Sequence, residues 1–157
     1  MLHDLEGHIA RARLAGLSVA ELAAIRETIR KYDDLLGDDG AWLAHGDCDV
    51  THIFSYDGVY SGIIDFGEIR GAPRLYDLAH HRLHDGERLP FETLPWLLEG
   101  YRQQAQLPDD YWVQINLFSM LVALRALGRG MLRNPKSQIV RVSERAIRRE
   151  LDELRSF

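Results

Sequence analysis

Two carboxylates and a histidine near the middle of the chain have the types and spacing for metal-assisted phosphoryl transfer. Asp47 lies in a polar loop, His52 follows five residues later, and Asp65 ends an apolar run. Between them, Asp57-Gly58 separates two apolar runs and predicts a β-hairpin, because both residues of such a turn need positive φ. A hairpin turns the chain back, so the two carboxylates can face one pocket. One carboxylate would deprotonate an acceptor hydroxyl, while the other and His52 hold Mg²⁺ or Mn²⁺ against phosphates.

Three motifs follow one another from residue 45 to residue 79. They are His45-Gly46-Asp47 with His52, then Ile64-Asp65-Phe66-Gly67, then Gly71-Ala72-Pro73-Arg74-Leu75-Tyr76-Asp77-Leu78-Ala79. Together they resemble the aminoglycoside phosphotransferase and choline kinase family, whose members are relatives of the protein kinases. The family patterns are HGDxxxxN, IDF/W-G and G-x-P-x-x-D-L-A, and the ordered set is far more specific than any one of them.

The resemblance covers about residues 41–80 directly and implies a role for five residues. Asp47 would be the catalytic base, and Asp65 and His52 the metal ligands. His45 and Asp77 would support the site structurally. ATP would be the phosphate donor, and the acceptor a small molecule with a hydroxyl group.

The chain departs from the family pattern at His52, which stands where the pattern has Asn. Some relatives resemble this sequence in carrying His there, and neutral imidazole can ligate a divalent ion. Imidazole is a softer ligand than an amide oxygen, so the choice between Mg²⁺ and Mn²⁺ stays open.

Other polar residues near the motifs have plainer interpretations. His80, His81 and His84 have partial zinc-site spacing, but His80 and His81 point about 100° apart on a helix. We therefore expect them at a solvated helix end. Cys48 has no second cysteine to pair with and is expected to fill space. Two glutamates could help hold a cationic substrate, although surface charge is their default interpretation: Glu68 and Glu87.

Composition narrows the class of protein. The 157 residues carry a net charge of −5, which argues against nucleic acid or an anionic membrane as the main partner and is compatible with a cationic acceptor. A single cysteine excludes an intramolecular disulfide and fits a reducing cytoplasm. No continuous apolar run approaches the roughly 18 residues of a membrane span.

The hydrophobic pattern predicts helices around one hairpin. Ser18 and Glu21 form a capping box that opens a helix. The segment Tyr111–Gly128 is apolar around most of its circumference and should be the buried central helix. The strand alternation after Asp57-Gly58 suits a partly buried strand. Helices are predicted at 4–15 and 18–36, from about 74, and at 91–104, 111–128 and 137–154. A break is predicted at Gly37–Gly40 and a loop at 66–73.

The predicted fold is α+β and mostly α, the C-terminal lobe of a protein-kinase-like fold, as one domain over residues 1–157. Residues 1–40 would be a helical lead-in, 41–80 the catalytic and metal-binding motifs, and 81–157 a helical body. The chain has two lysines, Lys31 and Lys136, and no G-x-G-x-x-G. We therefore expect the ATP-gripping N-terminal lobe to be absent and the chain alone to be inactive, whether it is a natural short protein or a fragment.

Two alternatives remain open. One is a noncatalytic, pseudokinase-like binding module. The other is a metal-dependent hydrolase that places His45, Asp47, His52 and Asp65 around a transition metal.

A lobe without its partner would expose apolar surface at the strand near Trp42 and in the helices before it, including Leu22, Ile25 and Ile29. We therefore predict a homodimer with contacts in residues 1–36.

Overall fold

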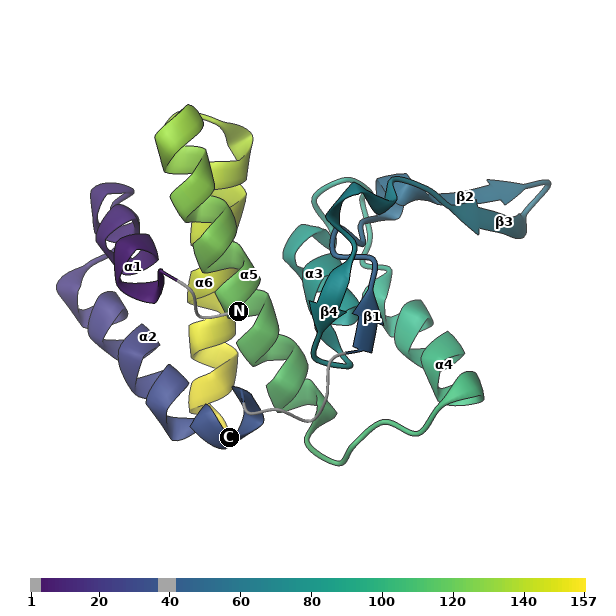
Figure 1. Ribbon diagram of the computed structural model, residues 1–157, viewed down its shortest axis with the longest axis horizontal. Helices are drawn as coiled ribbons and strands as arrows, with labels where there is room; N and C mark the ends of the chain where they lie inside the picture. Colours follow the sequence, from purple (N-terminus) through teal and green to yellow (C-terminus); the bar gives the residue numbers. More distant parts are fainter. Residues whose placement is uncertain (1–3, 37–41) are drawn as a thin grey trace.

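The computed structural model describes residues 4–36 and 42–157. Its centre is an extensive packing of two helices, α5 (Tyr111–Arg133) and α6 (Gln138–Arg155). Helices α1 (Leu5–Leu14) and α2 (Val19–Lys31) lie on one side of this pair, and α3 (Tyr76–His84) and the strands lie on the other (Figure 1). The fold is therefore mostly helical with short antiparallel strands, as the sequence predicts.

Helix α5 is the central helix that its apolar circumference predicts, and it extends five residues beyond the predicted end at Gly128. Every residue from Ile115 to Leu124 is buried. By length and composition alone α5 is also long and apolar enough to cross a membrane, yet 72% of its most apolar window is buried inside the chain. That burial is what the core helix of a globular domain shows.

Helix α2 begins as predicted and ends earlier. The hydroxyl of Ser18 accepts the backbone N–H of Glu21 at 3.2 Å, and the Glu21 carboxylate accepts the backbone N–H of Ser18 at 2.6 Å. The predicted end near Leu36 is wrong, because the backbone leaves helical geometry at Tyr32 and continues as a 3₁₀ turn, η1 (Asp33–Leu36). The predicted break at residues 37–40 lies outside the described residues.

The first two helices bury their apolar face within this chain. Leu22, Ile25 and Ile29 are 6%, 0% and 7% exposed, because α2 packs against α6 and α1 against α5. These three side chains are therefore not available to a second copy. Trp42 and Leu43, by contrast, are 54% and 81% exposed.

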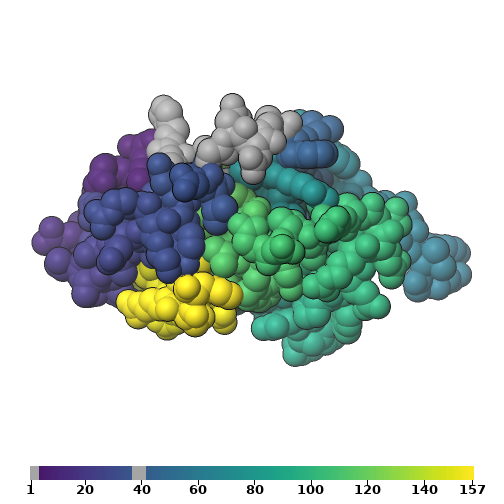
Figure 2. All heavy atoms as spheres, turned by 90° about the horizontal axis from the view of Figure 1, so that it is seen from below, coloured from purple at the N-terminus to yellow at the C-terminus, as the bar shows by residue number. Residues whose placement is uncertain are grey.

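The predicted hairpin is present as β2 (Ile53–Tyr56) and β3 (Val59–Ile63), joined at Asp57-Gly58 with φ of 49° and 77°. It projects from the body of the molecule, as its colour shows at one end of Figure 2. The prediction of a partly buried strand is wrong for most of its length. Tyr56, Val59 and Tyr60 are all more than 60% exposed, because no other described element packs on either face of the tip.

A second antiparallel pair was not predicted. Residues 66–73 were expected to form a loop, but they contain a 3₁₀ turn, η3 (Phe66–Glu68), and a strand, β4 (Arg70–Ala72). Strand β4 pairs with β1 (Trp42–Ala44), placing Leu43 opposite Gly71. The partner strand is almost 30 residues away in sequence, so the local pattern of apolar residues could not predict this pairing.

The remaining helices match the predicted order with shifted starts. Helix α3 begins at Tyr76, two residues later than predicted, and α6 begins and ends within one residue of its prediction. Helix α4 (Leu94–Gln104) begins three residues late, with Pro95 in its first turn, where a missing N–H costs nothing. A loop, residues 105–110, connects the end of α4 to the start of α5 (Figure 1).

Candidate active site

The loop after β1 is held by one carboxylate from the first turn of α3. The carboxylate of Asp77 accepts the backbone N–H of His45 at 2.8 Å and that of Gly46 at 3.0 Å. Gly46 has φ of 86°, and a Cβ there would overlap the carbonyl oxygen of Glu68, so only glycine fits. Asp77 therefore fixes the position from which Asp47 projects.

His45 ties the same loop to the far end of the hairpin. Its Nε2–H donates to the carbonyl oxygen of Ile64 at 2.8 Å, and its Nδ1 accepts the backbone N–H of Asp47 at 3.4 Å. The ring also packs against Phe66, with centroids 4.7 Å apart. Both ring nitrogens face backbone groups, so this imidazole is not free to ligate a metal.

His52 and Asp65 face each other across the base of the hairpin. Nδ1–H of His52 donates to the carbonyl oxygen of Asp47 at 2.8 Å, which leaves Nε2 as the nitrogen with a lone pair. Nε2 lies 3.8 Å from Oδ2 of Asp65. Asp65 has the left-handed backbone conformation (φ 67°) and a side chain that is 62% exposed. A short polar side chain tolerates this conformation, and it turns the carboxylate toward His52.

The Asp65–His52 pair has the donor chemistry of a magnesium site that is completed by substrate. Among residues 4–36 and 42–157, no group of three His, Cys, Asp or Glu side chains is placed to hold a metal ion. Mg²⁺ binds through one or two carboxylates and completes its octahedral shell with water and substrate phosphates. Two protein ligands therefore fit a Mg²⁺–nucleotide complex better than a closed structural metal site.

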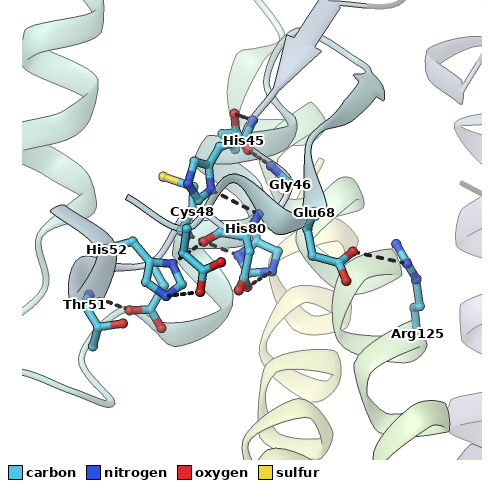
Figure 3. Close-up of polar contacts among 12 residues, drawn as sticks. His45, Gly46, Cys48, Thr51, His52, Glu68, His80 and Arg125 are labelled. Atoms are coloured by element: carbon cyan, nitrogen blue, oxygen red, sulfur yellow. Dashed lines mark hydrogen bonds and ion pairs between the residues drawn. The ribbon is translucent and has the colours of Figure 1, made fainter. Parts of the chain in front are cut away.

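His80 is a site residue that sequence reasoning missed. Its Nδ1–H donates to the carbonyl oxygen of Cys48 at 3.1 Å, and its Nε2 lies 3.4 Å from Oδ1 of Asp47. Burial lowers the pKa of His80 more than the nearby Asp47 carboxylate raises it. His80 is thus held beside Asp47 by its hydrogen bond to the Cys48 carbonyl oxygen. Figure 3 shows His45, His52 and His80 gathered around the loop.

The expected solvated helix end is wrong for α3. His80 and His81 are 8% and 2% exposed, and Nε2 of His81 lies 2.7 Å from the Thr93 hydroxyl. The signal was available in the spacing, because His80 lies three residues after Asp77 and so shares its helix face. Since Asp77 contacts the loop, His80 on the same helix face must also lie against it.

Cys48 is enclosed among carboxylates. Burial, together with the negative charges of Asp77, Asp49 and Asp47, raises the pKa of its thiol to about 12. The thiol is therefore protonated and unreactive at neutral pH, which agrees with a space-filling role.

A pocket of about 370 Å³ opens beside Asp47, between the loop, α3 and the second half of α5. Glu68 lies at its edge, where Arg70 binds its carboxylate and Arg125 lies 4.0 Å away (Figure 3). Glu87 is paired with Arg145 at 2.7 Å. Both glutamates are thus engaged by arginines and are not free to hold a cation.

The five residues named from the motifs thus lie together in the structure. Asp77 lies in α3, His45 and Asp47 in the loop after β1, His52 at the end of a 3₁₀ turn (Val50–His52), and Asp65 shortly after β3. Asp77 and His52 are hydrogen-bonded to the loop that carries Asp47, and His45 joins this loop to Ile64. The other residues around Asp47 were not predicted from the motifs and are brought there by the tertiary fold. They include the arginines of α5 and the His80 ring.

Comparisons with known proteins address the fold. No protein-family model matches the chain, and no curated protein matches it. A solved structure does: the "putative fructosamine-3-kinase" of Thermobifida fusca YX-ER1, with a TM-score of 0.58 and 21% identity over 90% of this chain. The chain has a kinase-like fold. It spans about half the length of that neighbour, 47% of whose residues are covered. At this identity the likeness concerns the fold alone.

Proposed function

We propose that the chain carries the acceptor-side and metal-binding part of an ATP-dependent small-molecule O-phosphotransferase. The observation that carries this proposal is the joint placement of Asp47 and the Asp65–His52 pair by one set of backbone hydrogen bonds. A base and two metal ligands around a hairpin are the parts that phosphoryl transfer requires of this side of the site. The kinase-like fold of the structural neighbour supports the same reaction class.

Each residue has a distinct task in the proposed reaction. The Asp47 carboxylate accepts a hydrogen bond from an acceptor hydroxyl in the adjacent pocket and takes its proton as the new O–P bond forms. Asp65 and Nε2 of His52 bind the metal ion. Bound Mg²⁺·ATP would supply the phosphoryl group and the neutralising charge. Asp77 and His45 keep the loop rigid, so that Asp47 stays within reach of the acceptor.

Within this class we assign the chain to the aminoglycoside phosphotransferase and choline kinase type, on the three ordered motifs between residues 45 and 79. The acceptor is then a small-molecule hydroxyl. A fructosamine, which the name of the structural neighbour mentions, falls in that class too.

A noncatalytic binding module is the second candidate, because the 157 residues contain no glycine-rich phosphate loop. Phosphotransfer would need ATP-gripping groups beyond those in this sequence. The hydrolase alternative loses support, since His45 uses both ring nitrogens on backbone groups.

Metal–nucleotide binding separates the two candidates. We expect Mn²⁺·ADP, measured by isothermal titration calorimetry of the preformed complex into the protein, to bind the chain and to bind Asp65→Asn at least about tenfold more weakly. Asp57→Asn is the matched control, since Asp57 lies in the same hairpin and also has positive φ (49° against 67°). Absence of binding by the wild-type chain would favour the noncatalytic module. Equal binding by Asp65→Asn and wild type would refute the metal-ligand assignment.

A further inference from the structure

The pocket beside Asp47 is rich in arginine, although the whole chain carries a net charge of −5. Its lining includes Arg70 from β4 and Arg125, Arg129 and Arg133 from α5. We propose that this pocket binds an anionic acceptor, whose carboxylate or phosphate group pairs with the α5 arginines while its hydroxyl faces Asp47. The role of the hydroxyl rests on the proposed function, whereas anion binding does not.

The three arginines of α5 form a row. Arg125, Arg129 and Arg133 are spaced by four residues, so they lie on one face of the helix and extend along roughly 12 Å of its axis. Arg129 and Arg133 are exposed on the pocket side rather than buried in the core. A ligand in the pocket can therefore reach them without rearrangement of the helix.

The positive charge of this row is only partly balanced. Arg70 binds the Glu68 carboxylate directly, and Arg125 and Arg129 each lie 4.0 Å from it. Arg133 forms no ion pair within the part of the chain that the structure describes. Four arginines thus face two carboxylates, Glu68 and Asp47, in the lining. The arginines thus exceed the carboxylates by two positive charges before any histidine is counted, which disfavours a cationic acceptor.

The start of α6 adds donors at the far end of the row. Ser137 is the N-cap residue of this 18-residue helix and lines the pocket. Its hydroxyl is buried and has no hydrogen-bond partner among the described residues. A buried hydroxyl is normally paired, and a helix N-terminus attracts negative charge. Both features suit an anion beside Arg133.

The position of the pocket favours the acceptor over the nucleotide. Its lining includes Asp47 and His80 but neither Asp65 nor His52, the proposed metal ligands. Phosphates bound to the metal would lie against that pair, on the hairpin side. An anion held by Arg129 and Arg133 therefore belongs to the molecule whose hydroxyl Asp47 contacts.

Glucose and three of its six-carbon derivatives test the charge preference by isothermal titration calorimetry on the 157-residue chain. We expect glucose 6-phosphate and gluconate to bind at least about tenfold more tightly than glucose or the cationic glucosamine. The double variant R129Q/R133Q should weaken binding of both anions roughly tenfold, as expected for two partly exposed ion pairs. The control R13Q/R155Q removes the same charge at exposed positions away from the pocket and should leave the affinity unchanged.

Three results would overturn the inference. The first is binding of glucosamine or glucose as tight as that of the anions. The second is an equal loss of anion affinity in both double variants. The third is displacement of glucose 6-phosphate by Mn²⁺·ADP, which would mean that the arginines hold nucleotide phosphates. Because the readout is binding of an anion in the pocket, a failure of Mn²⁺·ADP binding at Asp65 and His52 would count against the proposed function without affecting this test.

Discussion

Asp77 should stabilise both the fold and the site, and replacing it with alanine, beside a control at Asp85, tests both effects. The substitution removes an acceptor of two backbone N–H groups, at 2.8 Å from His45 and 3.0 Å from Gly46. A hydrogen bond to a charged acceptor contributes about 1.5–3 kcal/mol, and the geometry here is only partly buried. We therefore expect Asp77→Ala to lower the free energy of unfolding by about 3 kcal/mol, measured by urea denaturation.

The same substitution should loosen the metal ligands. The carbonyl oxygen of Asp47 orients His52 at 2.8 Å, so a disordered loop would release the imidazole. Removal of such supporting contacts typically lowers metal affinity about 10–100-fold. Asp77→Asn should lie between wild type and Asp77→Ala, because its amide oxygen replaces one acceptor while its NH₂ faces the other backbone N–H.

Asp85 provides the matched control at the other end of α3. Its carboxylate accepts the backbone N–H groups of Thr93 at 2.6 Å and Leu94 at 3.1 Å, at the start of α4 and away from Asp47. Asp85→Ala should therefore cost similar stability and leave Mn²⁺·ADP affinity unchanged. The reasoning is refuted if Asp77→Ala leaves the free energy of unfolding unchanged, or if both variants lose metal–nucleotide affinity equally.

Four further outcomes are expected. Asp47→Asn should abolish any phosphotransfer with an unchanged circular dichroism spectrum, since a general base contributes about 10²–10⁴-fold, and turnover by the folded variant would remove Asp47 from that role. Mg²⁺ alone should bind Asp65 and His52 with a dissociation constant on the order of millimolar, because phosphates normally complete its shell, and tight stoichiometric zinc there would favour a hydrolase. Burial lowers the pKa values of the α3 histidines below 6.5, so the unfolded chain binds more protons and stability should fall as pH drops from 7 to 5.5; a flat urea profile would contradict this, and His80→Gln should make it shallower. Self-association through residues 1–36 stays a prediction, which a strict monomer in light scattering at micromolar concentration would refute.

Local sequence determined the features whose causes lie within a few residues. Asp57-Gly58 specifies the hairpin turn because both residues accept positive φ, and Ser18 with Glu21 specifies the start of α2 because each caps the other. The continuous apolar surface of residues 111–128 required a central position. The spacing of Asp47, His52 and Asp65 likewise placed the proposed base and metal ligands at the two ends of one hairpin.

Features that depend on distant partners could not be predicted in this way. The residues next to β4 give no indication that it will pair with β1. The sequence therefore predicted a loop for residues 66–73. The hairpin strands had a half-buried pattern, but no described element covers their tip. The capping box and the apolar spacing correctly indicated α2, while only packing decided that Ile25 would be buried against this chain's own helices.

Tertiary structure also decided the chemical character of the pocket. His80 and Arg133 are separated from Asp47 by more than 30 and 80 residues. From the sequence, His80 was expected at a solvated helix end, and Arg133 lies beyond the predicted end of its helix at Gly128. The contact of Asp77 with the loop brings α3 and its His80 against Asp47, and the packing of α3 on α5 turns the arginine row toward the same space. Charge summed along the sequence predicts an acidic protein, whereas the field at a site depends on which charges the fold brings together.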